Sequence, residues 1–267
     1  MKNLMKKSLP GALICLTASM GTVAYAQLIG QDDRNEVKDM SYPYSAIGRL
    51  TTGTSQGEGY CTATLISENL IITAAHCVKG GYSYTFRPGF SRGRSKFKSS
   101  SAKVVLISGN YSKPGDTADY ALLVLKKPLG QEAGWFKFAD FPRESMNQPV
   151  YSRAGYGADG TSYSTLKEQT GCRMNLIGSG AAAFLVHECD LDHGDSGSAF
   201  FTYDPAKDPQ ATLFAIADLS RASACDVYGV DQYEPSIGQS SPCYNRAVPV
   251  QVFHSDLDTV LPPQSGH

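Results

Sequence analysis

Three separated segments carry the residue types that nucleophilic catalysis by a serine requires. Residues 194–198 read Gly-Asp-Ser-Gly-Ser, and His76 and Asp119 lie earlier in the chain. A serine hydroxyl is a weak nucleophile at neutral pH, so a base must accept its proton and an acid must hold that base in one tautomer. Ser196, His76 and Asp119 match those roles as nucleophile, base and orienting acid. The pattern predicts a serine hydrolase site, with the backbone N–H groups of Gly194 and Ser196 forming the oxyanion hole.

Each segment by itself has an ordinary structural interpretation. Gly, Asp and Ser are common turn residues, His76 next to Cys77 fits a buried pair, and an Asp before an apolar run fits the start of a strand. Asp116 is the nearest rival acid, but the apolar run that follows Asp119 would bury that carboxylate as the role requires. The three segments together favour the catalytic interpretation.

Other hydrolase and metal sites do not match these motifs. An α/β-hydrolase elbow needs G-x-S-x-G and places its His last, whereas here Gly197 directly follows the serine. Cys77 adjoins His76 in sequence, which argues against a cysteine nucleophile. Zinc sites need C-x-x-C or H-x-x-x-H clusters, and the sequence has neither. We therefore expect no metal and no cofactor.

The N-terminus has the organisation of a secretory signal. Three lysines within the first seven residues precede an apolar stretch over 9–23, and Ala24-Tyr25-Ala26 follows. This order predicts a signal peptide over 1–26 with cleavage after Ala26. The apolar stretch is short for a membrane span. We expect a secreted or periplasmic protein without stable membrane association.

The cysteine count agrees with export. Six of the seven cysteines lie beyond residue 26, and an even number in an exported chain predicts three disulfides. The formal net charge of −1 offers no argument for nucleic acid as a partner. We expect a monomer.

Short runs rich in β-branched and aromatic residues recur between Gly, Ser, Asn and Pro, which predicts an all-β fold. The predicted strands cover 46–50, 61–66, 70–74, 83–86, 103–107, 121–125, 150–154, 213–217 and 248–252. The helical candidates are one turn near His76 and a stretch over 249–260. A boundary within 134–147 would divide the mature chain into 27–140, carrying His76 and Asp119, and 141–267, carrying Ser196. The active site would then lie between the halves.

With these motifs placed, the chain resembles bacterial glutamyl endopeptidases and related trypsin-like serine proteases. The segments that carry the resemblance are 28–34, 42–47, 61–77, 119–125, 154–157 and 189–198. The resemblance implies two six-stranded antiparallel β-barrels, here with a short C-terminal helix, and no cofactor. It also implies hydrolysis of peptide bonds in polypeptide substrates through an acyl-enzyme on Ser196. The alternative is a catalytically silent protease-like binding protein, although such relatives typically lack a triad member.

The resemblance also suggests how the cysteines pair. It joins the cysteine next to the catalytic histidine to one on the preceding strand, which implies Cys61–Cys77. Cys172–Cys189 and Cys225–Cys243 follow as local pairs.

The chain departs from glutamyl endopeptidases where that family recognises its substrate. Those enzymes use a threonine five positions before the nucleophile and a histidine on a later strand, and here Leu191 and Ala217 occupy the corresponding places. Asp190, aided by Asp218, would place negative charge at the base of the pocket. We therefore favour Arg or Lys over Glu before the scissile bond, with a medium apolar residue as the alternative. The alternative is that Asp190 is a structural turn residue that points away from the pocket.

The new N-terminus suggests one further expectation. Relatives use a freed α-amino group near Leu28 to order the pocket, and Asp195 could pair with such an amine. Signal cleavage would expose Gln27, so a trimming step to Leu28 or Ile29 would then activate the enzyme. The alternative is that Asp195 only forms hydrogen bonds within its own loop.

Overall fold

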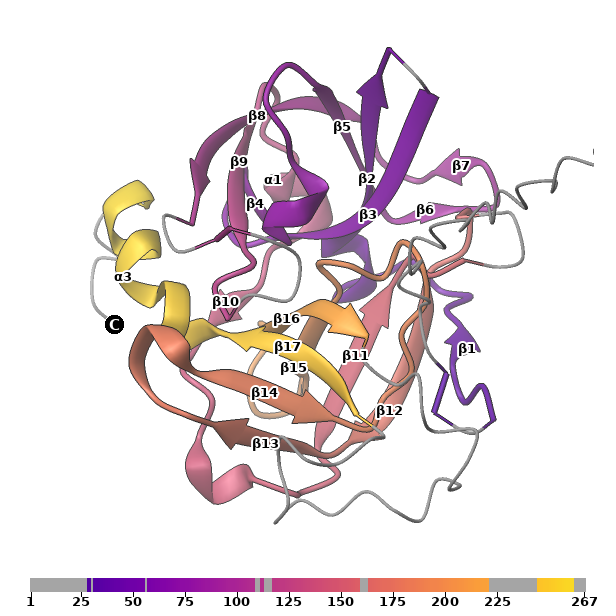
Figure 1. The fold of residues 1–267 in the computed structure, drawn as a ribbon. Coiled ribbons are helices and arrows are strands. Elements are labelled where there is room, and N and C mark those ends of the chain that lie inside the picture. Colours follow the sequence, from indigo (N-terminus) through magenta and orange to yellow (C-terminus); the bar gives the residue numbers. More distant parts are fainter. Residues whose placement is uncertain are drawn as a thin grey trace, which may run out of the picture.

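Two β units make up the part of the chain that the structure describes (Figure 1). This structure, a computed structural model, describes residues 28–29, 31–55, 57–108, 111–112, 117–158, 163–220 and 244–261. One apolar core runs through both units, since the same buried cluster contains Ile47 and Phe86 of the first and Phe201 and Ile216 of the second. The predicted all-β class is confirmed.

The first unit is a closed barrel of six strands in the order β2-β3-β4-β9-β8-β5. In β5, exposed or half-buried residues alternate with buried ones, so Tyr84 and Phe86 share one face of the strand. In β4, consecutive apolar residues are all buried. The bounds are β2 (Ile47–Thr54), β3 (Gly57–Leu65), β4 (Leu70–Thr73), β5 (Ser83–Pro88), β8 (Ser100–Ile107) and β9 (Ala121–Leu125), with the hairpin β6 (Phe90–Ser91) and β7 (Arg94–Ser95) outside the barrel.

The second unit is a nine-stranded sheet rather than the predicted six-stranded barrel. Its path runs β1-β12-β11-β15-β16-β17-β14-β13, and β10 pairs with β16 in parallel. Arg173 alone separates β12 from β13, although these strands lie near opposite ends of the path, so the sheet curls back toward itself. The strands are β1 (Asn35–Glu36), β10 (Lys137–Phe138), β11 (Tyr151–Gly155), β12 (Lys167–Cys172), β13 (Met174–Ile177), β14 (Phe184–His187), β15 (Ala199–Thr202), β16 (Thr212–Ser220) and β17 (Asn245–Pro249).

The predicted C-terminal helix is present as α3 (Val250–Val260), and the overlapping strand prediction over 248–252 is wrong beyond Pro249. Proline has no N–H for a sheet ladder, so β17 ends there. Val250, Phe253 and Leu257 are buried at helical spacing. Phe253 packs on Tyr120, with ring centroids 5.1 Å apart. Helix α3 therefore contacts the residue that directly follows Asp119.

The segment between the two units carries structure of its own. It holds the short helix α1 (Gly130–Ala133), β10 and the turn η3 (Arg143–Ser145). Sequence patterns also missed β12 to β15. In β12 the reason is composition, because Lys-Glu-Gln-Thr is a polar run and the strand is mostly half-buried. Short 3-10 turns also occur as η1 (Tyr44–Ala46), η2 (Ala75–Cys77) and η4 (Gly180–Ala182).

Two disulfides connect neighbouring elements, Cys61–Cys77 between β3 and η2 and Cys172–Cys189 between β12 and the loop after β14. The predicted Cys225–Cys243 bridge and the signal peptide over 1–26 lie outside the described residues.

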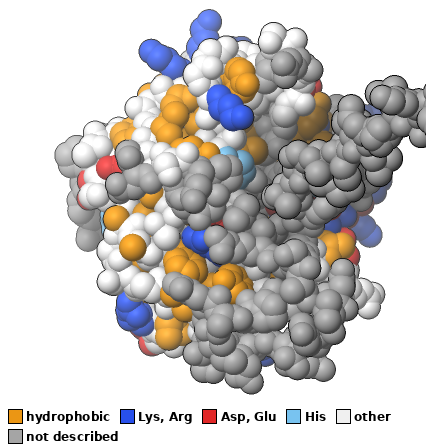
Figure 2. All heavy atoms as spheres, in the orientation of Figure 1, with side chains coloured by type: hydrophobic (Ala, Val, Ile, Leu, Met, Phe, Trp, Pro, Cys, Tyr) orange, Lys and Arg blue, Asp and Glu red, His pale blue; other side chains and the backbone are white. Residues whose placement is uncertain are grey.

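Among the described residues on the face shown in Figure 2, the charged side chains form no pattern typical of a polyanion site. Lys and Arg side chains are scattered among uncharged ones over the described part of that face. Among the described residues, no helix has the length and apolar character needed to cross a membrane.

Candidate active site

His76 and Asp119 are brought together by two neighbouring strands of the first barrel. β4 pairs with β9 so that Thr73 lies opposite Ala121, and the chain continues from Thr73 into η2 while Asp119 precedes β9. His76 Nδ1 lies 2.7 Å from Asp119 Oδ2, and the His76 backbone N–H donates to Asp119 Oδ1 at 2.9 Å. Asp119 is fully buried. Both carboxylate oxygens therefore bind His76, which fixes the orientation of the imidazole ring.

Ser196 reaches this pair from the second unit. Ser196 lies in the loop over 188–198 between β14 and β15, which we call the serine loop. Its Oγ lies 2.7 Å from His76 Nε2. The Ser196 carbonyl accepts a hydrogen bond from the Thr62 N–H at 2.9 Å, and the Gly197 N–H donates to the Ala217 carbonyl at 2.8 Å. The serine loop is thus anchored on β3 of one unit and β16 of the other. The structure brings the three predicted residues within hydrogen-bonding distance in the order Asp119, His76, Ser196.

Thr62 is a site residue that the sequence did not reveal. Its hydroxyl donates to the Gly194 carbonyl at 2.9 Å and accepts the Tyr156 N–H at 2.8 Å. It is fully buried between the two units. A threonine within a β-strand has no distinguishing pattern, so this role depends wholly on tertiary contacts.

The two predicted oxyanion donors, Gly194 and Ser196, lie in a sharply turned loop that two glycines with positive φ shape. Gly194 has φ +93° and Gly197 has φ +84°, a region that favours glycine. Among the described residues, neither Gly194 nor Ser196 uses its backbone N–H in a hydrogen bond. These two N–H groups are available to a ligand oxygen.

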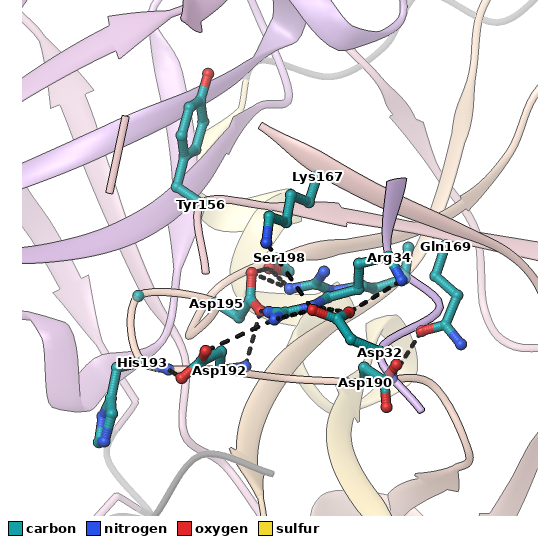
Figure 3. A network of polar contacts seen from close by, with 12 residues as sticks. Asp32, Arg34, Tyr156, Lys167, Gln169, Asp190, Asp192, His193, Asp195 and Ser198 are labelled. Carbon is teal, nitrogen blue, oxygen red and sulfur yellow. Dashed lines mark hydrogen bonds and ion pairs between the residues drawn. The ribbon is translucent and has the colours of Figure 1, made fainter. Parts of the chain in front are cut away.

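Asp195 does not have the partner expected for it. Its carboxylate pairs with two arginines. Arg34 Nη1 lies 3.0 Å from Oδ2 (Figure 3), and Arg153 Nη2 contacts Oδ1. The carboxylate also accepts the Asp192 N–H at 2.8 Å. Guanidinium groups thus occupy both carboxylate oxygens in this structure, where the sequence suggested an ion pair with a freed α-amino group.

Asp190 does not supply a free charge to a pocket either. Its oxygens accept the backbone N–H groups of Ile29 at 2.6 Å and Asp33 at 3.0 Å, and the side chain is buried. Burial raises the pKa of Asp190 despite these two hydrogen bonds. These contacts anchor the N-terminal segment and favour the alternative, in which Asp190 is a structural residue.

The other predicted pocket residues are also buried. Leu191 and Ala217 belong to the apolar core of the second unit. Asp218 lies 3.6 Å from Arg246, whose guanidinium stacks over the Phe184 ring at 4.3 Å. An arginine thus balances the charge of Asp218, the second acidic group expected at the pocket base.

Among the described residues, Cys61, His76 and Cys77 hold atoms of the kind that bind metal ions within 4.8 Å of one another. The two sulfur atoms form a disulfide and His76 Nε2 faces Ser196. This group therefore offers no thiolate to a metal ion.

A second histidine is buried behind the serine loop and should make stability depend on pH. The His187 ring lies against Phe200, with centroids 4.4 Å apart, and burial lowers the pKa of His187 from 6.5 to about 3. Between these values the unfolded chain binds a proton that the folded chain excludes. The free energy of unfolding should thus fall as pH drops below 6.5, by roughly 1.4 kcal/mol per pH unit from this group, with no such effect above it.

Urea unfolding between about pH 4.5 and 7 measures this slope. His187→Phe should flatten it, whereas His193→Gln, at an exposed position in the loop after β14, should leave it unchanged. Equal slopes for wild type and His187→Phe would contradict the prediction.

A closed six-stranded barrel beside a curled β sheet, with a His-Asp pair on the first and a serine loop on the second, defines the chymotrypsin class of fold. The sequence model of the family named Trypsin matches residues 32–229. The chain therefore belongs to the trypsin family.

Two relatives illustrate the similarity in sequence. Serine protease 23 of Bos taurus is 34% identical over 133 residues, covering 38% of this chain and 34% of the relative. A glutamyl endopeptidase of Bacillus licheniformis is 26% identical over 181 residues, covering 65% of this chain and 54% of the relative. The chain thus spans between about a third and a half of the length of these curated relatives.

Solved structures support the same fold. The structure of a Glu endopeptidase in complex with MPD has a TM-score of 0.65 at 20% identity and covers 87% of this chain and 99% of its own. A scabies mite inactivated protease paralogue has a TM-score of 0.58 at 17% identity, covering 86% and 100%.

Proposed function

We propose that this protein is a serine endopeptidase with Ser196 as nucleophile, His76 as general base and then acid, and Asp119 as the acid that orients it. The observation that carries the proposal is the unbroken chain of 2.7 Å contacts from Asp119 Oδ2 through His76 to Ser196 Oγ. Trypsin family membership supports it.

The reaction follows from these contacts. Ser196 Oγ bonds to the carbonyl carbon of the scissile peptide while its proton passes to His76 Nε2. The negative charge on the carbonyl oxygen is stabilised by the N–H groups of Gly194 and Ser196. His76 then protonates the leaving amine as the C–N bond breaks, which leaves an acyl ester on Ser196. Water, deprotonated by His76, hydrolyses that ester and restores the serine.

The export of the chain is part of the same proposal. The signal sequence over 1–26 and the two disulfides among the described residues support a secreted or periplasmic enzyme, cleaved after Ala26. The units 27–140 and 141–267 would then supply His76 with Asp119 and Ser196 respectively.

A serine-directed phosphonate tests the activity most directly. It should label Ser196 at neutral pH, and the purified protein should cleave members of a peptide library. Ser196→Ala should do neither. A folded protein that takes no label and cleaves no peptide would instead favour the alternative of a catalytically silent binding protein.

For specificity we propose a medium apolar side chain before the scissile bond, in place of Arg or Lys. Asp190 binds backbone N–H groups and Asp218 is balanced by Arg246, so neither supports recognition of a cation. Leu191 and Ala217 offer no polar partner to a glutamate. An unpaired buried charge costs several kcal/mol.

Matched peptides with Leu, Arg or Glu at that position decide the specificity. We expect kcat/KM for Leu to exceed the values for Arg and Glu about 10- to 100-fold or more, which corresponds to roughly 1.4–3 kcal/mol. A preference for Arg would show that a carboxylate faces the substrate after all. A preference for Glu would show that a positively charged side chain faces the substrate.

A further inference from the structure

Arg34, which lies in the N-terminal segment just before β1, makes a buried contact with the serine loop. Arg34 has a side chain only 1% exposed, and its Nε and Nη2 donate to both oxygens of Asp32 at 2.9 and 3.0 Å. The third nitrogen, Nη1, donates to Asp195 Oδ2 at 3.0 Å. The planar guanidinium thus bridges Asp32 and the residue next to Ser196 (Figure 3).

Asp195 in turn ties together the loop that carries the oxyanion donors. Its carboxylate accepts the Asp192 N–H, its own N–H donates to the Asp192 carbonyl at 2.9 Å, and its carbonyl accepts the Ser198 N–H at 2.8 Å. Gly194 and Ser196 flank it directly. The orientation of the Asp195 side chain therefore governs where these two N–H groups point.

A nearby glycine shows that the chain makes room for this pair. A Cβ on Gly157 would lie 2.3 Å from Asp195 Oδ2 and 2.5 Å from Arg34 Nη1. Any side chain there would force the two groups apart. The segment just after β11 therefore approaches Arg34 and Asp195 closely because residue 157 is a glycine.

We propose that Arg34 is a positioning residue for the oxyanion hole. Through Asp195 it orders residues 192–198, so that the loop is set by an internal guanidinium and not by a freed chain terminus. Arg153, fully buried and paired with the other oxygen of Asp195, completes the arrangement but comes from the sheet itself. This inference rests on the proposed peptidase activity.

The kinetic test compares Arg34→Ala with Arg92→Ala. Arg92 pairs with Glu36 at 2.6 Å but is 72% exposed, so it is a matched loss of an arginine that also contacts the N-terminal segment. Arg34→Ala should lower kcat about 10²-fold, comparable with loss of an oxyanion donor, with a smaller change in KM. Arg92→Ala should keep the wild-type values. Millimolar guanidinium chloride should restore part of the Arg34→Ala activity without affecting Arg92→Ala.

Two further forms keep the proposal open to refutation. Arg34→Lys retains the charge without the fork and should have an intermediate kcat, and it carries the test if Arg34→Ala does not fold. Enzyme that begins at Gln27 and enzyme trimmed to Ile29 should have equal kcat, because the ordering group lies within the chain. A wild-type kcat in Arg34→Lys together with no activity before trimming would overturn the proposal.

Amide hydrogen exchange of a peptide spanning 190–200 separates this inference from the proposed function, because it needs no turnover. Exchange there should be faster in Arg34→Ala than in wild type, slow again with guanidinium, and unchanged in Arg92→Ala. Unchanged exchange in Arg34→Ala would refute the positioning role even in an active enzyme. An inactive wild type in which exchange responds as expected would refute only the peptidase activity.

Discussion

Ser196→Ala is expected to lower kcat by about 10⁶-fold, and Asp119→Asn by about 10⁴-fold, without loss of the fold. The alanine removes the nucleophile. The asparagine keeps the shape of the acid but donates a hydrogen bond where His76 Nδ1 must donate, so the imidazole is held in the wrong tautomer for accepting the Ser196 proton. Steady-state hydrolysis of one peptide substrate, with the Tm of each variant, measures both effects.

The control for this pair is Ser101→Ala, at an exposed position on β8 of the first barrel, which should retain wild-type kcat. Because the triad acts as a unit, combining the two site substitutions should cost little more than Ser196→Ala alone. Additive losses would contradict the arrangement of one base serving one nucleophile.

Gly194→Ala is expected to lower kcat about 10²- to 10³-fold, through displacement of an oxyanion donor. The added Cβ would lie 2.4 Å from the Tyr156 carbonyl oxygen and 2.6 Å from the Tyr163 ring. Since Gly194 also has φ +93°, the loop must both leave its conformation and move away from these neighbours.

Gly93→Ala separates the two causes. Gly93 has φ +80°, and a Cβ there would meet nothing within 4 Å. This control should lose about 1–2 kcal/mol of stability from backbone strain alone and keep its kcat. A Gly194→Ala protein with wild-type kcat would show that the Gly194 N–H does not bind the oxyanion.

The chemistry of the candidate site was predictable from the sequence because it depends on residue type. Catalysis of this kind needs a nucleophilic serine, a histidine and a buried acid in any fold, and residue types alone identified all three. The strands of the first barrel were predictable for a similar reason, since an apolar run such as 121–125 predicts a buried strand from its composition alone. β12 was not, because its polar residues become a strand only through pairing with β11 and β1.

The partners of the acidic residues near the serine depended on tertiary structure alone. Asp190 and Asp195 have the same side chain and lie five residues apart, yet one binds the backbone of the N-terminal segment and the other binds Arg34 and Arg153. Arg34 lies 161 residues from Asp195 along the chain. The sequence by itself thus determined which groups are available for catalysis. Which acidic groups bind an arginine and which bind backbone N–H groups was decided by contacts between segments that folding brings together.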